Sequence, residues 1–128
     1  MIKKGSKTYS IFFNKCPKCH EGKFWHNNNP YLNFFKKNSI TNSNCDKCNF
    51  FYEIEPGFWF GAMYVSYAIA VSLVLVIGIL LYNLIDNINT STLVLTLSIL
   101  IIISSPINHF FSRLIWINIF VNYSKKRK

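Results

Sequence analysis

The sequence predicts a small zinc-ribbon β domain over residues 1–57, an α-helical transmembrane hairpin over 58–112, and a C-terminal amphipathic, interface-lying helix with a basic tail over 113–128. Three observations predict this order. All four cysteines stand in two C-x-x-C steps, residues 58–82 carry no charge, and a second apolar run begins at Leu93.

The two cysteine steps predict a metal site. They are separated by 25 residues, which is the ligand spacing of a structural zinc site, and the four thiolate ligands would be Cys16, Cys19, Cys45 and Cys48. His20 and His26 could replace a ligand, but four thiolates already complete a tetrahedron. Two alternatives stay open. The C-x-x-C-H pattern that ends at His20 also matches covalent haem attachment, and the cysteines could form disulfides or a dithiol redox centre.

Short strands are expected on either side of each cysteine step. Thr8–Phe13 is a β-prone run that leads into the first step, Lys23–His26 would return as its partner, and Asn49–Glu55 would leave the second step as a strand. Gly22 and Asn49 follow the two steps, where a residue that tolerates positive φ is useful. A domain of fewer than about 60 residues rarely folds without a disulfide or a structural metal. We therefore expect bound metal to decide whether this domain folds.

A short helix is predicted after Asn29, because Asn followed by Pro is a favourable N-cap and first-turn pair. Its aromatic face would hold Tyr31, Phe34 and Phe35, with Lys36 and Lys37 beside it. Two interpretations stay open: the helix covers the ribbon, or it rests on lipid headgroups.

Two spans are predicted from the apolar runs. Phe58–Tyr82 would be about 37 Å long as a helix, which is enough to cross a hydrocarbon core of about 30 Å. The second span is expected from Leu93 to about Phe111, with Pro106 inside it, followed by the amphipathic helix to about Asn122. A single long kinked helix is the alternative.

The charge pattern predicts the topology. Both flanks of the hairpin are basic, including the tail Lys125–Lys128, whereas the turn between the spans carries only Asp86. The positive-inside rule then places both termini in the cytoplasm. That compartment is reducing, which favours thiolate-bound zinc over disulfides or attached haem.

Two further groups of residues are candidates for binding. Small residues along the first span predict a helix-packing groove for the second span, for another membrane protein or for a second copy of the chain; they are Gly57, Gly61, Ala62, Ser66 and Ala70. His109 and Arg113 lie four residues apart near the interface. They suggest a site for a haem propionate, a quinone or a lipid phosphate.

Several of these motifs together resemble one family. They are Cys16-Pro-Lys-Cys-His-Glu-Gly22, Asn29-Pro-Tyr31, Cys45-Asp-Lys-Cys48, Tyr52-Glu-Ile-Glu-Pro-Gly-Phe58 and Gly61-Ala-Met-Tyr-Val-Ser-Tyr-Ala68. The chain resembles the DUF983 proteins over about residues 12–120. That resemblance implies a small bacterial membrane protein of the Bacteroidetes type with a cytoplasmic zinc ribbon. Asn49 departs from the glycine usual after the second step. Association with cytochrome oxidase assembly in some relatives suggests a respiratory complex as partner.

These observations favour an interaction, subunit or assembly module over an enzyme, because the chain has no Ser-His-Asp arrangement, phosphate loop or metalloprotease motif. Membrane lipid and another integral membrane protein are the expected partners. Nucleic-acid binding is the first alternative, since the lysines of residues 1–57 could form a patch beside aromatic residues, but no arginine is present there to read bases. A thiol redox or metal-handling protein is the second.

Overall fold

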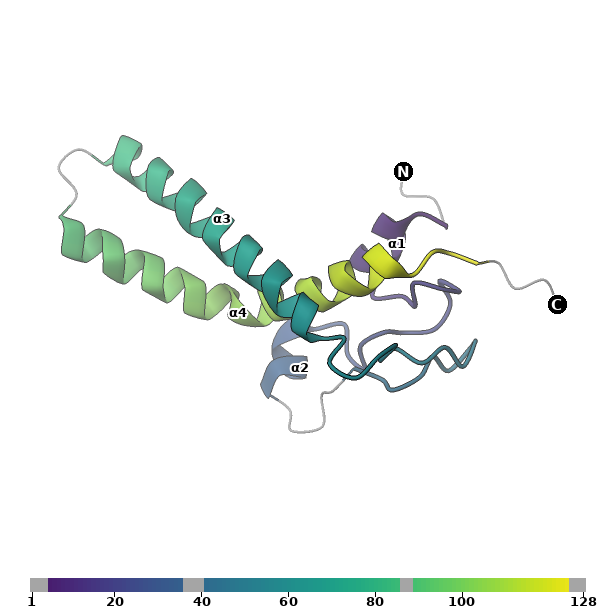
Figure 1. Ribbon diagram of the computed structural model, residues 1–128. Coiled ribbons are helices and arrows are strands. Elements are labelled where there is room, and N and C mark those ends of the chain that lie inside the picture. The colour runs from purple at the N-terminus through teal and green to yellow at the C-terminus, as the bar shows by residue number, and fades with distance from the viewer. Residues whose placement is uncertain (1–4, 36–40, 86–88, 125–128) are drawn as a thin grey trace.

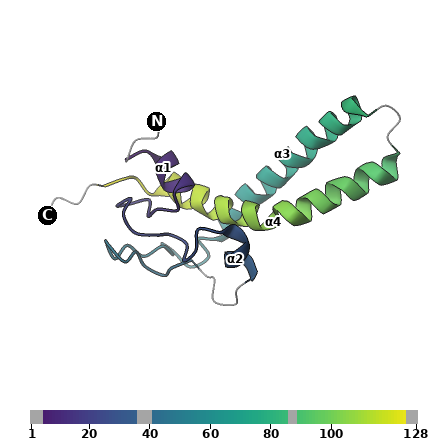
Figure 2. The same ribbon diagram turned by 180° about the vertical axis from the view of Figure 1, so that it is seen from behind.

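A computed structural model describes residues 5–35, 41–85 and 89–124. Its helices are α1 (Lys7–Phe12), α2 (Pro30–Phe35), α3 (Phe60–Leu84) and α4 (Thr90–Phe120). Helices α3 and α4 form a hairpin that projects from a base, and α1, α2 and the cysteine-containing loops gather around the C-terminal half of α4 (Figures 1 and 2). The expected basic tail Lys125–Lys128, the loop acid Asp86 and the pair Lys36–Lys37 lie outside the described residues.

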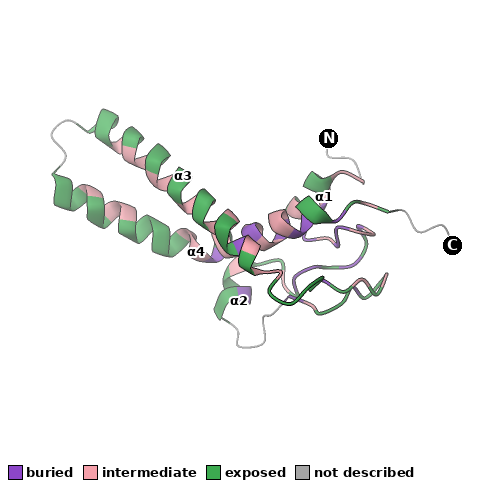
Figure 3. Ribbon diagram, in the orientation of Figure 1, coloured by how far each residue is buried: buried purple, intermediate pink, exposed green. Residues whose placement is uncertain are grey.

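The two expected long apolar helices are confirmed. Helices α3 and α4 contain 25 and 31 residues, and their mean hydropathies of 2.5 and 1.9 make both long and apolar enough to cross a membrane. In the most apolar part of each, 0% and 6% of residues are buried, whereas a core helix of a soluble domain would be mostly buried. Figure 3 shows this exposed surface along the whole hairpin. An apolar surface of this extent needs lipid or a protein partner to cover it.

The C-terminal amphipathic helix is not a separate element, which corrects the main expectation and agrees with the alternative of one long helix. Residues 113–120 continue α4 without interruption, although Pro106 lies inside it. Proline lacks an amide N–H, so the carbonyl of Ile102 loses its helical donor and the helix bends (Figure 1). Beside this bend the Tyr31 hydroxyl donates to the Ile103 carbonyl at 2.9 Å. The side chain of Tyr31 therefore bonds to the helix backbone close to the position where Pro106 interrupts the helical hydrogen bonds.

Helix α2 is confirmed where it was expected. The side-chain oxygen of Asn29 accepts a hydrogen bond from the Tyr31 amide at 3.0 Å, as an N-cap does. The helix packs against α4, where the ring of Phe34 meets the imidazole of His109 edge-on at 5.9 Å. Phe35 points outward and is 78% exposed.

The expected strands are not found among residues 5–35, 41–85 and 89–124. Thr8–Phe13, expected as β, instead forms most of α1, since Ser10 is buried and its hydroxyl accepts a hydrogen bond from Asn118 of α4 at 3.1 Å. Tertiary contact therefore outweighs the β-propensity of this run. Two isolated antiparallel bridges, Lys15 with Lys23 and Asn44 with Phe51, flank the two cysteine steps. They lie where the ribbon's hairpins were expected but are too short to count as strands.

The base and α4 share one hydrophobic core. Its fully buried side chains include Phe24, Trp25 and Tyr52 from the loops, and Leu114 and Ile117 from α4. The buried residues concentrate at this junction in Figure 3. The cysteine-containing segment is thus packed directly onto the helix that continues into the hairpin.

Candidate functional site

Each cysteine step forms a tight turn with the same backbone pattern. The amide of His20 donates to the Cys16 carbonyl at 2.9 Å, and the amide of Asn49 donates to the Cys45 carbonyl at 2.9 Å. Both residues adopt positive φ, of 57° and 50°, which His and Asn tolerate better than most residues. The expectation for Asn49 is confirmed, whereas in the first turn this conformation belongs to His20 and not to Gly22.

The two turns bring all four cysteine sulfurs together. Every pair of sulfurs lies within 4.8 Å, with Cys16 to Cys48 at 3.8 Å and Cys19 to Cys45 at 3.6 Å. A tetrahedral site with metal–sulfur bonds of about 2.3 Å needs sulfurs about 3.8 Å apart. The four side chains therefore fit one metal ion, and they form the cluster predicted from the sequence.

Gly22 is required for a different reason from the one expected. A Cβ atom on Gly22 would overlap the sulfur of Cys45, so only glycine lets the first turn approach the second. Its carbonyl also accepts a hydrogen bond from the Cys16 amide at 2.8 Å. Gly22 therefore sets the spacing between the two halves of the site.

The metal-free thiols differ in their pKa. Burial raises the pKa of Cys16 far above its usual value and raises that of Cys48 to about 11. Burial also disfavours the thiolate of Cys45, but hydrogen bonds from the backbone of Lys47 and Cys48 outweigh it and lower its pKa to about 7. A divalent cation must therefore displace protons from Cys16 and Cys48 when it binds near neutral pH.

Tyr52 is a neighbour of the sulfurs that sequence reasoning missed as a site residue. It is 1% exposed, its hydroxyl donates to the Lys23 carbonyl at 3.1 Å, and the same hydroxyl lies close to the thiols of Cys16 and Cys45. Its place in an alternating run, Phe50, Tyr52 and Ile54, predicted a buried face but not this contact. His20 lies outside the sulfur cluster, and its Nδ1 accepts a hydrogen bond from the Gly5 amide at 3.1 Å.

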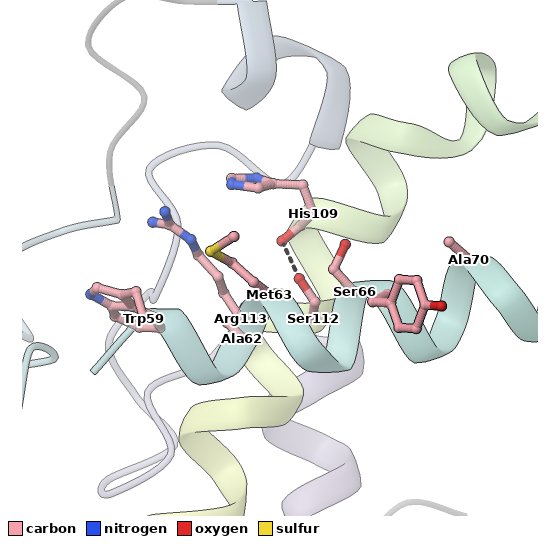
Figure 4. A pocket seen from close by; sticks show the side chains of 9 residues that line it. Trp59, Ala62, Met63, Ser66, Ala70, His109, Ser112 and Arg113 are labelled. Carbon is pink, nitrogen blue, oxygen red and sulfur yellow. Dashed lines mark hydrogen bonds between the residues drawn. The ribbon is translucent and has the colours of Figure 1, made fainter. Parts of the chain in front are cut away.

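The other predicted residues meet at a pocket between α3 and α4. This cavity of about 340 Å³ is lined by Ala62, Ser66 and Ala70 of α3 and by His109 and Arg113 of α4, among others. Figure 4 shows the side chains of His109 and Arg113 on the same side of α4, above the small residues of α3. Two groups that were predicted separately thus line one cavity.

The aromatic rings around Arg113 were also missed by the sequence analysis. The Arg113 guanidinium lies 5.1 Å from the ring of Trp59 and 5.8 Å from that of Trp25, within cation–π range. Trp25 also contacts the imidazole of His109 at 5.6 Å and donates from its indole N–H to the Phe110 carbonyl at 3.3 Å. Trp25 does not line the pocket, but it connects two residues that do, His109 and Arg113, to the core beside the sulfur cluster.

The two glycines of the expected groove differ in their positions: Gly57 lies outside helix α3, whereas Gly61 packs against the chain's own helix α4. Gly57 precedes α3 and adopts a φ of 82°, so it lies in the turn and not on the helix face. A Cβ on Gly61 would overlap the indole of Trp116, whose N–H donates to the Phe58 carbonyl at 2.8 Å. The chain's own α4 therefore fills the groove at Gly61, while Ser66 and Ala70 line the open pocket.

No known protein family, curated protein or solved structure matches this chain. The resemblance to the DUF983 proteins stays a prediction.

Proposed function

We propose that the chain is a membrane-anchored zinc-ribbon protein that acts as an interaction, subunit or assembly module of a membrane complex. In this proposal it lies in the bacterial inner membrane with both termini in the cytoplasm, and it is not an enzyme. A respiratory complex is the partner that the family resemblance suggests. Zinc is the proposed metal, because four thiolates at tetrahedral spacing suit Zn²⁺.

The direct packing of the sulfur cluster onto α4 is the observation that carries the proposal. Phe24 and Tyr52 pack edge to face at 4.8 Å beside the cysteines, and Trp25 stacks on Phe110 at 5.4 Å. Because these rings form one core, metal binding would order the base and the cytoplasmic half of α4 together. A base stabilised by bound metal would then hold the α3–α4 hairpin at a defined angle to the cysteine-containing loops.

The surface available to a partner is the outer face of α3. Tyr64, Tyr67 and Leu75 are 77%, 71% and 58% exposed, and no hydrogen bond to the hydroxyl of either tyrosine is found in the part of the chain that the structure describes. In a bilayer such a face is covered by lipid or by another helix. Its aromatic residues lie at the start of α3, as in an interfacial belt.

The test is purification of the tagged chain from native membranes in mild detergent, with metal analysis and in-membrane photocrosslinking from position 64. We expect one zinc per chain and one membrane protein that crosslinks at this position and co-purifies in stoichiometric amount. Cys45→Ser should remove the zinc and the partner together, whereas Gly78→Ala, remote from the site, should keep both.

Recovery of the metal-loaded chain without any membrane partner, or with a partner that Cys45→Ser retains in full, would contradict the proposal. Recovery of RNA in place of a membrane protein would favour the nucleic-acid alternative. Bound haem, or a chain without zinc, would show that the cysteines serve another chemistry.

A further inference from the structure

Arg113 is a cation without a protein counterion in the described structure. Among residues 5–35, 41–85 and 89–124 no side chain or carbonyl accepts a hydrogen bond from its guanidinium, and none forms an ion pair with it. Glu53 is near enough to act on it electrostatically, but this carboxylate is exposed and lies beyond ion-pair distance. The five N–H donors of Arg113 are therefore left for a ligand or for water.

Aromatic rings surround this cation at the edge of the pocket. The rings of Trp59 and Trp25 lie near the guanidinium, and the imidazole of His109, one helical turn before Arg113, contacts Trp25 and Phe34. Contact with two indole rings restricts the orientations of the guanidinium, and its planar set of N–H donors suits an oxyanion such as phosphate. The contacts with Trp59 and Trp25 therefore orient the Arg113 guanidinium before an anionic group binds.

The rest of the pocket is lined mainly by small and apolar side chains, and it opens sideways. In Figure 4 Trp59 and Arg113 lie at one end and Ala70 at the other, and the eleven steps along the chain from Trp59 to Ala70 correspond to about 16 Å of helix. A second cavity of about 460 Å³ is lined by Phe60, Met63, Tyr64 and Tyr67, and it shares Met63 and Tyr67 with the first. Met63 and Tyr67 are 64% and 71% exposed, so both cavities open onto the hairpin's outer surface.

We propose that this pocket binds one anionic phospholipid, with the headgroup phosphate on Arg113 and an acyl chain along the Met63–Tyr67–Ala70 face of α3. An amphiphile fits this pocket, because the cation lies at one end and no charged side chain lines the other, where Ser66, Tyr67 and Ala70 lie. The pocket lies at the first turns of α3, where the charge-free stretch begins and headgroups would be found. This inference does not depend on whether the chain assembles a complex.

The test is native mass spectrometry of the full metal-loaded chain in mild detergent, titrated separately with phosphatidylglycerol, phosphatidylcholine and inorganic phosphate. We expect one phosphatidylglycerol to bind about ten-fold more tightly than phosphatidylcholine, whose choline cation offsets the phosphate charge. Arg113→Gln should weaken phosphatidylglycerol about ten-fold or more, because it removes a charge-assisted hydrogen bond. The charge-matched control Lys23→Gln, at an exposed position of the base, should change the affinity for phosphatidylglycerol less than two-fold.

Ala70→Leu tests the acyl end without touching the charge. It should weaken phosphatidylglycerol binding several-fold, while the metal content stays at the wild-type level. If Arg113→Gln does not fold, the binding measured for Ala70→Leu alone tests the proposal. The proposal is overturned if Ala70→Leu and Arg113→Gln both bind like wild type, or if Lys23→Gln weakens binding as much as Arg113→Gln. Inorganic phosphate that displaces the lipid at equal concentration would assign the site to free phosphate, and a co-purifying quinone or haem would assign it to that ligand.

Discussion

Replacing Gly22 by alanine should disrupt the metal centre without removing any ligand. The added Cβ would overlap the Cys45 sulfur, whereas non-bonded heavy atoms need about 3.5–4.0 Å of separation. A metal–sulfur bond tolerates a change of only about 0.2 Å, so Cys45 must leave the coordination sphere or the two turns must separate.

The magnitude follows from the number of ligands. Structural zinc contributes roughly 10–16 kcal/mol in small zinc domains, or about 2.5–4 kcal/mol per ligand when four share it. Loss of the Cys45 ligand should therefore weaken zinc binding about 100-fold or more. The backbone of Gly22 does not require positive φ and its hydrogen bond to Cys16 is kept, so the effect is steric.

The assay is competition for zinc against a chromophoric chelator, with the full chain in mild detergent. Gly78→Ala is the matched control, because a Cβ there would meet only a Leu97 methyl at 3.8 Å, an ordinary contact. It should bind zinc like wild type. If Gly22→Ala also binds within about three-fold of wild type, the close approach of the two cysteine turns has been misassigned.

Three further outcomes are expected. Tyr52→Phe should weaken zinc binding about 10-fold in the same competition, since hydrogen bonds around metal ligands typically contribute that much; an unchanged affinity would show that its hydroxyl serves only the Lys23 carbonyl. Trp116→Phe should lower the free energy of unfolding by about 1 kcal/mol, because it removes the hydrogen bond to the Phe58 carbonyl. Denaturant titration of the metal-loaded chain measures this free energy. No change would mean that the hydrogen bond is dispensable. Zinc affinity should rise with pH, because the raised pKa values of Cys16 and Cys48 keep both thiols protonated near pH 7. At least two protons per zinc should be released in calorimetry across buffers, and a pH-independent affinity would contradict these pKa shifts.

The sequence alone was sufficient for features that depend on spacing and periodicity. Two C-x-x-C steps predicted the four-sulfur cluster, since neighbouring ligands reach one ion from a single turn. The charge-free runs predicted α3 and α4 because length and hydropathy are local properties. The N-cap at Asn29 was likewise readable from two adjacent residues.

Tertiary structure decided what depends on contacts between distant residues. Ser10 bonds Asn118 across 108 positions, which makes helix α1 out of a β-prone run, and Trp25 bonds Phe110 across 85 positions, which joins the sulfur cluster to α4. No local pattern marks Gly22 as the residue that faces Cys45, or places Trp59 over Arg113. Such contacts arise from packing two segments into one core, because the side chain that fills a given space is chosen by shape and not by sequence neighbours.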